Sequence, residues 1–184
     1  REVLILGAGP EGIRNSSQIE NFIKRKNTLT LSLNVNRFIS EDLIDAFVIV
    51  NRIRFLTELN KKISNDKNII LPLHILSEDM KKDIKSNEVL DYGCNISSGL
   101  MEAGERHCII PYELAIAYAL SILTAGNAKK IYLAGFDGFD IHDPRQEEML
   151  HVFKLFKSIS SIPIISITKT NYPLEKRTIH DPSV

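Results

Sequence analysis

The chain has 184 residues, of which 43% are hydrophobic and 25% charged, and Lys plus Arg equals Asp plus Glu at 23 each. This composition is typical of a globular domain with a substantial core. The balanced charge argues against nucleic acid as a partner, because nucleic-acid-binding domains carry a basic excess. It also argues against electrostatic docking to a membrane. The longest apolar stretch, 114–123, is too short to span a bilayer, so we expect a cytoplasmic protein without a membrane span.

The two cysteines, Cys94 and Cys108, form no C-x-x-C motif and have no paired histidines nearby. Reduced core thiols are therefore a better interpretation than a disulfide. The chain has no initiator Met and begins two residues before an apolar run. We interpret it as a fragment of a longer chain.

Apolar runs and helical spacings alternate along the sequence. The predicted strands are 3–6, 28–33, 46–50, 69–71, 130–134 and 162–167. The predicted helices are 17–26, 54–64, 78–85, 111–125 and 145–157, and a polar, glycine-rich loop is predicted at 91–108. This alternation predicts an α/β fold, with a doubly wound, mostly parallel Rossmann-like sheet in a single domain that covers residues 1–184.

The first predicted strand leads into GAGPEG, residues 7–12, which matches the G-x-G-x-x-G pattern of dinucleotide-binding folds. Two features argue against NAD or FAD. The predicted helix cap, Ser17, lies well past the glycines, and the second strand ends in Asn34 where a carboxylate would hold the ribose. We expect the turn to approach the phosphate of another ligand through Gly7, Gly9 and Pro10. The alternative is a tight turn without a ligand. Beside a phosphate, Glu11 would have to turn outward or bind a cation.

Amides and hydroxyls follow other predicted strands. Asn34 and Asn51 have the paired donors and acceptors that suit a ribose or a base edge, although helix capping is an equally good interpretation. In the long loop, Ser97, Ser98 and Gly99 could close over a phosphate or a carboxylate, or form a flexible surface turn. His107 and Tyr112 are the candidates for a general base.

Asp137 directly follows the 130–134 strand, where a carboxylate can hold a ribose or a metal ion. Asp140, His142 and Asp143 could extend this position into an Mg²⁺ site, because Mg²⁺ prefers oxygen ligands. Their spacing matches no strict metal motif, and Asp143 before Pro144 also fits a helix N-terminus. We therefore predict no metal site of the protein's own and leave Mg²⁺ as an open alternative.

Several segments together resemble a bacterial superfamily. They are GxGP after the first strand, SLN at the end of the second, SSG in the loop, and AKKIYLAGFDG after an apolar helix. The superfamily includes small sialyltransferases that use CMP-sialic acid, motility accessory factors and hydroxymethylpterin pyrophosphokinase-like proteins. The resemblance implies a nucleotide or nucleotide-sugar binding domain, sialyltransferase-like, in bacterial surface-polysaccharide biosynthesis. Its ligand would be a CMP-sugar or another nucleotide. The residues that the resemblance assigns to this site are Gly7, Gly9, Pro10, Asn34, Asn51, Ser97, Ser98, Gly99 and Asp137.

The order VLILGxG, SLNxN, VNRxRF, KKIYLAGFDG and SITKTNYPLEKRTIH is also similar to a domain of certain TIM-barrel aldolases. These are of the hydroxymethylglutaryl-CoA lyase or 4-hydroxy-2-oxovalerate aldolase type, are encoded with surface-polysaccharide genes, and carry the domain after the barrel. This similarity implies the alternative function, an accessory domain with no catalysis of its own and an N-terminal aldolase barrel as partner. In either case we expect a homo-oligomer.

Overall fold

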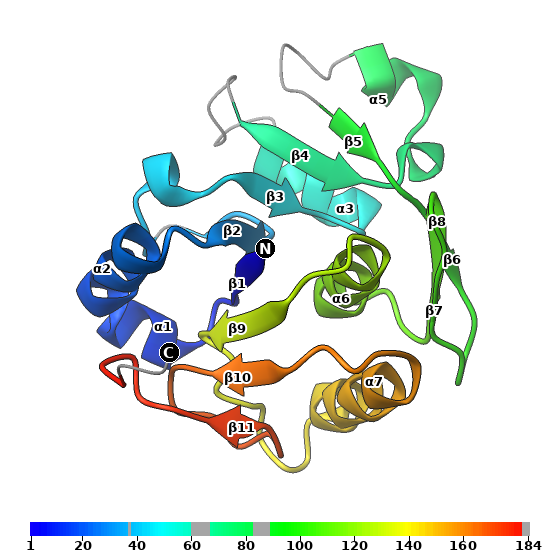
Figure 1. Cartoon of the computed structure of the whole chain (residues 1–184). Helices are drawn as coiled ribbons and strands as arrows, with labels where there is room; N and C mark the ends of the chain where they lie inside the picture. Colours follow the sequence, from blue (N-terminus) through cyan, green and yellow to red (C-terminus); the bar gives the residue numbers. More distant parts are fainter. Residues whose placement is uncertain (37, 60–66, 83–88, 182–184) are drawn as a thin grey trace.

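The centre of the fold is an eight-stranded, parallel sheet in the order β11-β10-β9-β1-β2-β3-β4-β5 (Figure 1). The computed structural model describes residues 1–36, 38–59, 67–82 and 89–181. The strands of the sheet are β1 (Glu2–Leu6), β2 (Leu29–Leu33), β3 (Ala46–Val48), β4 (Asn68–Leu71), β5 (Val89–Asp91), β9 (Lys130–Ala134), β10 (Ile164–Ser166) and β11 (Glu175–Lys176). The strand order reverses between β1 and β9, because the chain builds outward from β1 in one direction and then returns to its other side.

Helices cover both faces of the sheet, which explains why the central strands are apolar runs rather than alternating ones. The helices are α1 (Pro10–Arg14), α2 (Ser16–Lys26), α3 (Arg52–Arg54), α5 (Glu78–Lys82), α6 (Ala115–Ala125) and α7 (Pro144–Ile159). Short helical turns are η1 (Glu41–Leu43), the π-helical η2 (Phe55–Leu59) and η3 (Leu73–Ile75). The doubly wound, Rossmann-like α/β fold expected from the sequence is thus confirmed.

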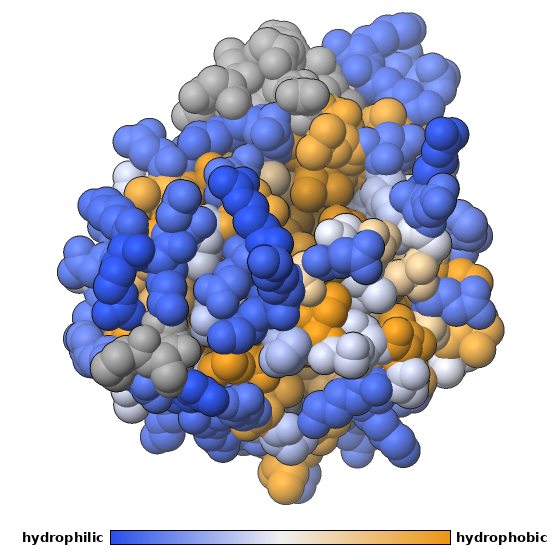
Figure 2. Space-filling view, in the orientation of Figure 1, coloured by the Kyte–Doolittle hydropathy of each residue, from blue (hydrophilic) through white to orange (hydrophobic). Residues whose placement is uncertain are grey.

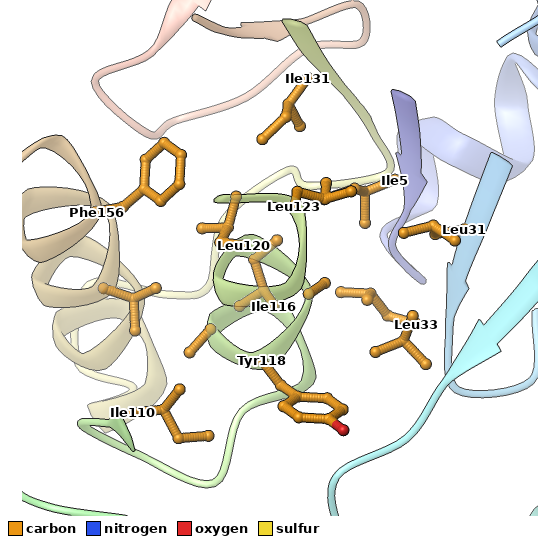
Figure 3. Packing of buried hydrophobic residues seen from close by; sticks show 14 of the residues in the cluster. Ile5, Leu31, Leu33, Ile110, Ile116, Tyr118, Leu120, Leu123, Ile131 and Phe156 are labelled. Atoms are coloured by element: carbon orange, nitrogen blue, oxygen red, sulfur yellow. The ribbon is translucent and has the colours of Figure 1, made fainter. Parts of the chain in front are cut away.

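The larger core lies between the sheet, α6 and α7. Figure 3 shows Leu120 and Leu123 of α6 between Phe156 of α7 and Ile5 of β1. All four are at most 5% exposed, so α6 is apolar nearly all round because it is buried between two layers. On the other face, α2 packs Ile19, Phe22 and Ile23 against the sheet.

A second, three-stranded sheet occupies the region that the sequence predicted to be loop. Its order is β6-β8-β7, with bounds Gly93–Ile96 for β6, Glu102–Ala103 for β7 and His107–Ile110 for β8. β6 and β8 are parallel, and β7 is antiparallel to β8. Figure 1 shows this sheet beside α6, away from the central strands. The expectation of a loop at 91–108 was wrong because these strands are only two to four residues long and include one glycine and several polar residues.

Two predicted helix starts also differ from the structure. A helix begins at Pro10, inside the glycine run, and α2 follows from Ser16 with Asn15 as its N-cap. Proline at the first helical position is preorganised for this start, so the late start that we expected at Ser17 was wrong. The helix expected from residue 111 begins instead at Ala115, after a turn in which the Leu114 N–H donates to the Tyr112 carbonyl at 2.7 Å.

The remaining predicted helices are confirmed in part. Residues 52–59 are helical over α3 and η2, and residues 78–82 form α5; the predicted continuations over 60–64 and 83–85 lie outside the described residues. None of the described helices is long and apolar enough to cross a membrane. On the face in Figure 2, hydrophilic side chains predominate, and apolar ones gather in the upper centre, over β4 and α3.

Candidate functional site

A cleft of about 690 Å³ opens at the carboxyl ends of β1, β2, β3 and β9. It lies where the strand order reverses, the usual position of ligands in open α/β sheets. Its volume lies within the range of small-molecule sites. The lining residues are Gly7–Pro10, Leu33, Asn34, Val50, Asn51, Ile53, Arg54, Glu113–Ile116, Gly135–Phe139, Arg145, Met149 and Tyr172. Six predicted positions therefore share one cleft: Gly7, Gly9, Pro10, Asn34, Asn51 and Asp137.

The backbone N–H groups of the glycine turn are mostly engaged within the protein. Gly7 N donates to the Ala134 carbonyl at 2.8 Å, and Gly9 N donates to the Gly135 carbonyl at 2.9 Å. Pro10 has no N–H. Within the described chain, Ala8 therefore carries the one N–H of residues 7–10 that donates to no protein group. The turn has little capacity left to bind a phosphate through its backbone.

Asp137 occupies the N-terminus of α1. Its Oδ2 accepts a hydrogen bond from the Glu11 N–H at 2.8 Å, while its buried Oδ1 has no partner among the described residues. A carboxylate here satisfies the helix N-terminus as a phosphate would, and its charge would repel a phosphate placed beside it. The Glu11 carboxylate, 20% exposed, pairs with the Arg14 guanidinium at 2.5 Å, so its charge is compensated by a cation of the same helix.

The glycines of the turn allow it to pack against the turn after β9. A Cβ atom on Gly7 would lie 2.6 Å from the Gly135 carbonyl oxygen, and one on Gly9 would lie 2.5 Å from Asp137 Oδ1. Gly135 itself has φ +75°, a backbone conformation that residues other than glycine rarely adopt. The G-x-G pattern is therefore explained by the close approach of two backbone turns.

Three asparagines support the rim of the cleft in different ways. Asn34 has φ 57°, a left-handed conformation that asparagine tolerates. Asn51 is a helix cap: its Oδ1 accepts from the Arg54 N–H at 3.0 Å, and its Nδ2 donates to Glu113 Oε2 at 2.6 Å. Asn36, 7% exposed, donates from Nδ2 to the Gly7 carbonyl at 2.9 Å. Sequence reasoning did not single out Asn36, because a lone asparagine beyond a strand end gives no sign of its partner.

The N-terminus of α6 faces the cleft without a cap. Leu114 is the N-cap residue and provides no side-chain hydrogen bond. The N–H groups of Ala115, Ile116 and Ala117 donate to no acceptor within the described residues. Such an end carries a partial positive charge and free donors. Sequence reasoning missed it because it placed the start of the helix at Pro111.

The cleft lining also includes a cation, Arg145, that is held by its neighbours. The Arg145 guanidinium lies 4.3 Å from the centroid of the Phe139 ring and pairs with Asp143 at 2.5 Å. The hydrogen bonds that Asp143 accepts from the side chain and N–H of Arg145 hold the pKa of its carboxyl below the usual range. Burial raises the pKa of Tyr172, which also lines the cleft, to about 12.

Five predicted site residues lie outside the lining of this cleft. Ser97, Ser98 and Gly99 form an exposed turn after β6, and Gly99 adopts φ 75°. His107 is the exposed first residue of β8. The Tyr112 hydroxyl lies 2.8 Å from Nδ1 of His151. The structure therefore does not bring these side chains together with the glycine turn.

The described residues contain no group of three or more His, Cys, Asp or Glu side chains that could hold a metal ion. Comparison with known proteins finds no family model, no curated protein and no solved structure that matches the chain.

Proposed function

We propose that this chain is a nucleotide or nucleotide-sugar binding domain whose ligand occupies the cleft at the reversal of strand order. The observation that carries the proposal is the joining of that cleft with the free N-terminus of α6. A cleft of about 690 Å³ is large enough for a nucleotide. The sialyltransferase-like role in bacterial surface-polysaccharide biosynthesis remains part of this proposal and rests on the sequence resemblance.

We assign the phosphate of the ligand to α6 rather than to the glycine turn. Ala115 and Ile116 line the cleft and have free N–H donors, whereas the turn offers Ala8 alone and places Asp137 beside it. Helix N-termini bind phosphate through such donors and through the helix dipole. The glycine turn then serves as a rigid wall of the cleft.

The nucleoside would lie toward the apolar and aromatic lining. Leu33, Val50, Phe136 and Met149 line the cleft and are at most 8% exposed. Such a wall suits the apolar faces of a base and a ribose, while polar groups at the rim orient the ligand. The proposal is limited to binding, because His107 and Tyr112 lie outside the lining.

The first test is thermal unfolding of the chain with CMP, CDP or UDP. A ligand at a hundred times its Kd stabilises the folded state by about 2.7 kcal/mol. For a chain of this size that raises the Tm by roughly 5–10 °C. If none of these nucleotides shifts the Tm at about 1 mM, the Kd is weaker than the millimolar range and the proposal is contradicted.

The second test removes one donor from α6. Ala115→Pro deletes the N–H at the first helical position, where proline is tolerated. Leu114 already has φ −108° and ψ 127°, which a following proline requires. The nucleotide Kd should rise roughly tenfold or more, because a hydrogen bond to a charged group contributes about 1.5–3 kcal/mol. Ala115→Ser keeps the N–H and is the matched control; equal affinity of the two variants would place the anion elsewhere.

The aldolase-associated alternative predicts no nucleotide affinity and a stable complex with an aldolase barrel. The same titration separates it from the proposal. A Tm that no nucleotide changes, together with copurification of such a barrel, would favour the alternative.

A further inference from the structure

Two thiols face each other in the small sheet beside α6. In the parallel pairing of β6 with β8, Cys94 lies directly opposite Cys108. They are 7% and 1% exposed, and neither forms a disulfide. Residues paired in this way lie one strand spacing apart, about 4.8 Å, which falls within the Cα separation that a disulfide spans. The side chains of an in-register parallel pair also point to the same face of the sheet.

One sulfur borders a passage from solvent. Cys94 lines a second open cavity of about 250 Å³, together with Ile75, Ile96 and Glu113. A cavity of this size admits a small hydroperoxide, since it is several times the volume of a water molecule. Glu113 also lines the large cleft, so the two cavities adjoin. Cys108 lies behind Cys94, within the core that includes α6.

Each of the two thiols shifts the pKa of the other. The neighbouring Cys94 thiol, and to a lesser degree Ser121, lowers the pKa of Cys108, while Cys108 and burial raise the pKa of Cys94. Ionisation of the pair therefore falls on Cys108, while the proton stays on Cys94. Cysteines react with oxidants as thiolates, so a singly ionised pair is suited to oxidation.

We propose that Cys94 and Cys108 form a dithiol site that a hydroperoxide oxidises to an intramolecular disulfide. The Cys94 sulfur attacks the peroxide through the cavity as its proton passes to the Cys108 thiolate; the O–O bond breaks, the Cys94 sulfenic acid forms, and the leaving hydroxide takes that proton from Cys108 to give water. The Cys108 thiolate then attacks the Cys94 sulfur, the S–O bond breaks, and the leaving hydroxide takes a proton from solvent to become a second water. With hydrogen peroxide, two thiols and one peroxide give one disulfide and two waters. The site is independent of the proposed nucleotide function.

The test treats the native chain with hydrogen peroxide and quenches it with acid. The two cysteines of the chain should both disappear from a thiol titration in denaturant, while the intact mass falls by two hydrogen atoms. Dithiothreitol should restore both thiols. Retention of both thiols, addition of oxygen to the mass, or a covalent dimer in place of the internal disulfide would each overturn the proposal.

Substitutions test whether both cysteines are needed and whether the peroxide enters through the second cavity. Cys94→Ser and Cys108→Ser should each abolish the internal disulfide, with folding checked by circular dichroism; the mass change of the unsubstituted chain decides the question should either fail to fold. Ile96→Trp fills the mouth of the second cavity at a side chain that is 55% exposed. It should slow oxidation by roughly an order of magnitude, because exchange and oxidation rates depend on access. Ile141→Trp, at an 80% exposed side chain outside both cavities, is the matched control; equal rates in the two variants would refute entry through this cavity.

Discussion

Gly9→Ala tests whether glycine is required at this position because the turn packs closely against the turn after β9. Gly9 has φ −70° and ψ 151°, which alanine adopts without strain. Without a clash, the change would stabilise the fold by about 0.4–1 kcal/mol through the unfolded state. The added Cβ would, however, lie 2.5 Å from Asp137 Oδ1 and 2.6 Å from the Gly135 carbonyl oxygen. The side chain of Asp137 can move, whereas the backbone of Gly135 cannot do so without shifting β9.

The cost has two parts. Overpacking costs about 1–3 kcal/mol. Displacing Asp137 also removes its charged hydrogen bond to the Glu11 N–H, about 1.5–3 kcal/mol. After subtracting the gain in the unfolded state, the free energy of unfolding should fall by roughly 2–5 kcal/mol, and the Tm by about 5–15 °C.

Urea unfolding followed by circular dichroism measures this loss. The matched control is Gly126→Ala, because Gly126 has φ −80° and its added Cβ would lie 3.3 Å from the Ile122 carbonyl oxygen. The control should change stability by less than about 1 kcal/mol. Equal stability of the two variants would refute the packing explanation of the glycines.

Three further changes probe the same region. Asn36→Ala leaves the buried Gly7 carbonyl without its hydrogen bond, so stability in urea should fall by about 1–3 kcal/mol; an unchanged midpoint would contradict this. Asp137→Asn removes the charge at the start of α1 and should lower the Tm, measured by calorimetry, since the dipole favours an anion there. An NMR titration should find the pKa of Asp143 below its usual value in the unsubstituted chain and higher in Arg145→Gln. Because folding depresses this pKa, the stabilisation by the pair is present at neutral pH and is lost as the pH falls through the lowered pKa.

The parts of the fold that could be predicted from the sequence are those set by strong local patterns. The runs at 3–6 and 130–134 are apolar because both faces of the sheet are covered, and each forms a strand. The small sheet was missed because its strands are short and its pairing joins segments across a turn. Such pairing depends on tertiary contacts rather than on local propensity.

The candidate site was predicted at the strand ends and missed at the helix. The rule that ligands lie beyond the carboxyl ends of parallel strands predicts Gly9, Asn34 and Asp137 at one edge of the sheet, and in the structure all three line one cleft. The sequence could not indicate that the Asp137 carboxylate would take the place of an anion at the N-terminus of α1. The hydrogen bond that puts it there joins Glu11 to Asp137, and these residues are far apart in the chain. The start of α6 was also missed, because Pro111 suggested a helix start whereas the chain first makes a turn in which the Leu114 N–H donates to the Tyr112 carbonyl.

The most direct measurement of the central claim is an amide NMR titration of the chain with CMP. Binding with the phosphate at α6 predicts that the largest shifts fall on the N–H groups of Ala115 and Ile116, with smaller ones at Ala8. Shifts confined to residues 97–99 and His107, or no shifts at any concentration up to about 1 mM, would contradict it.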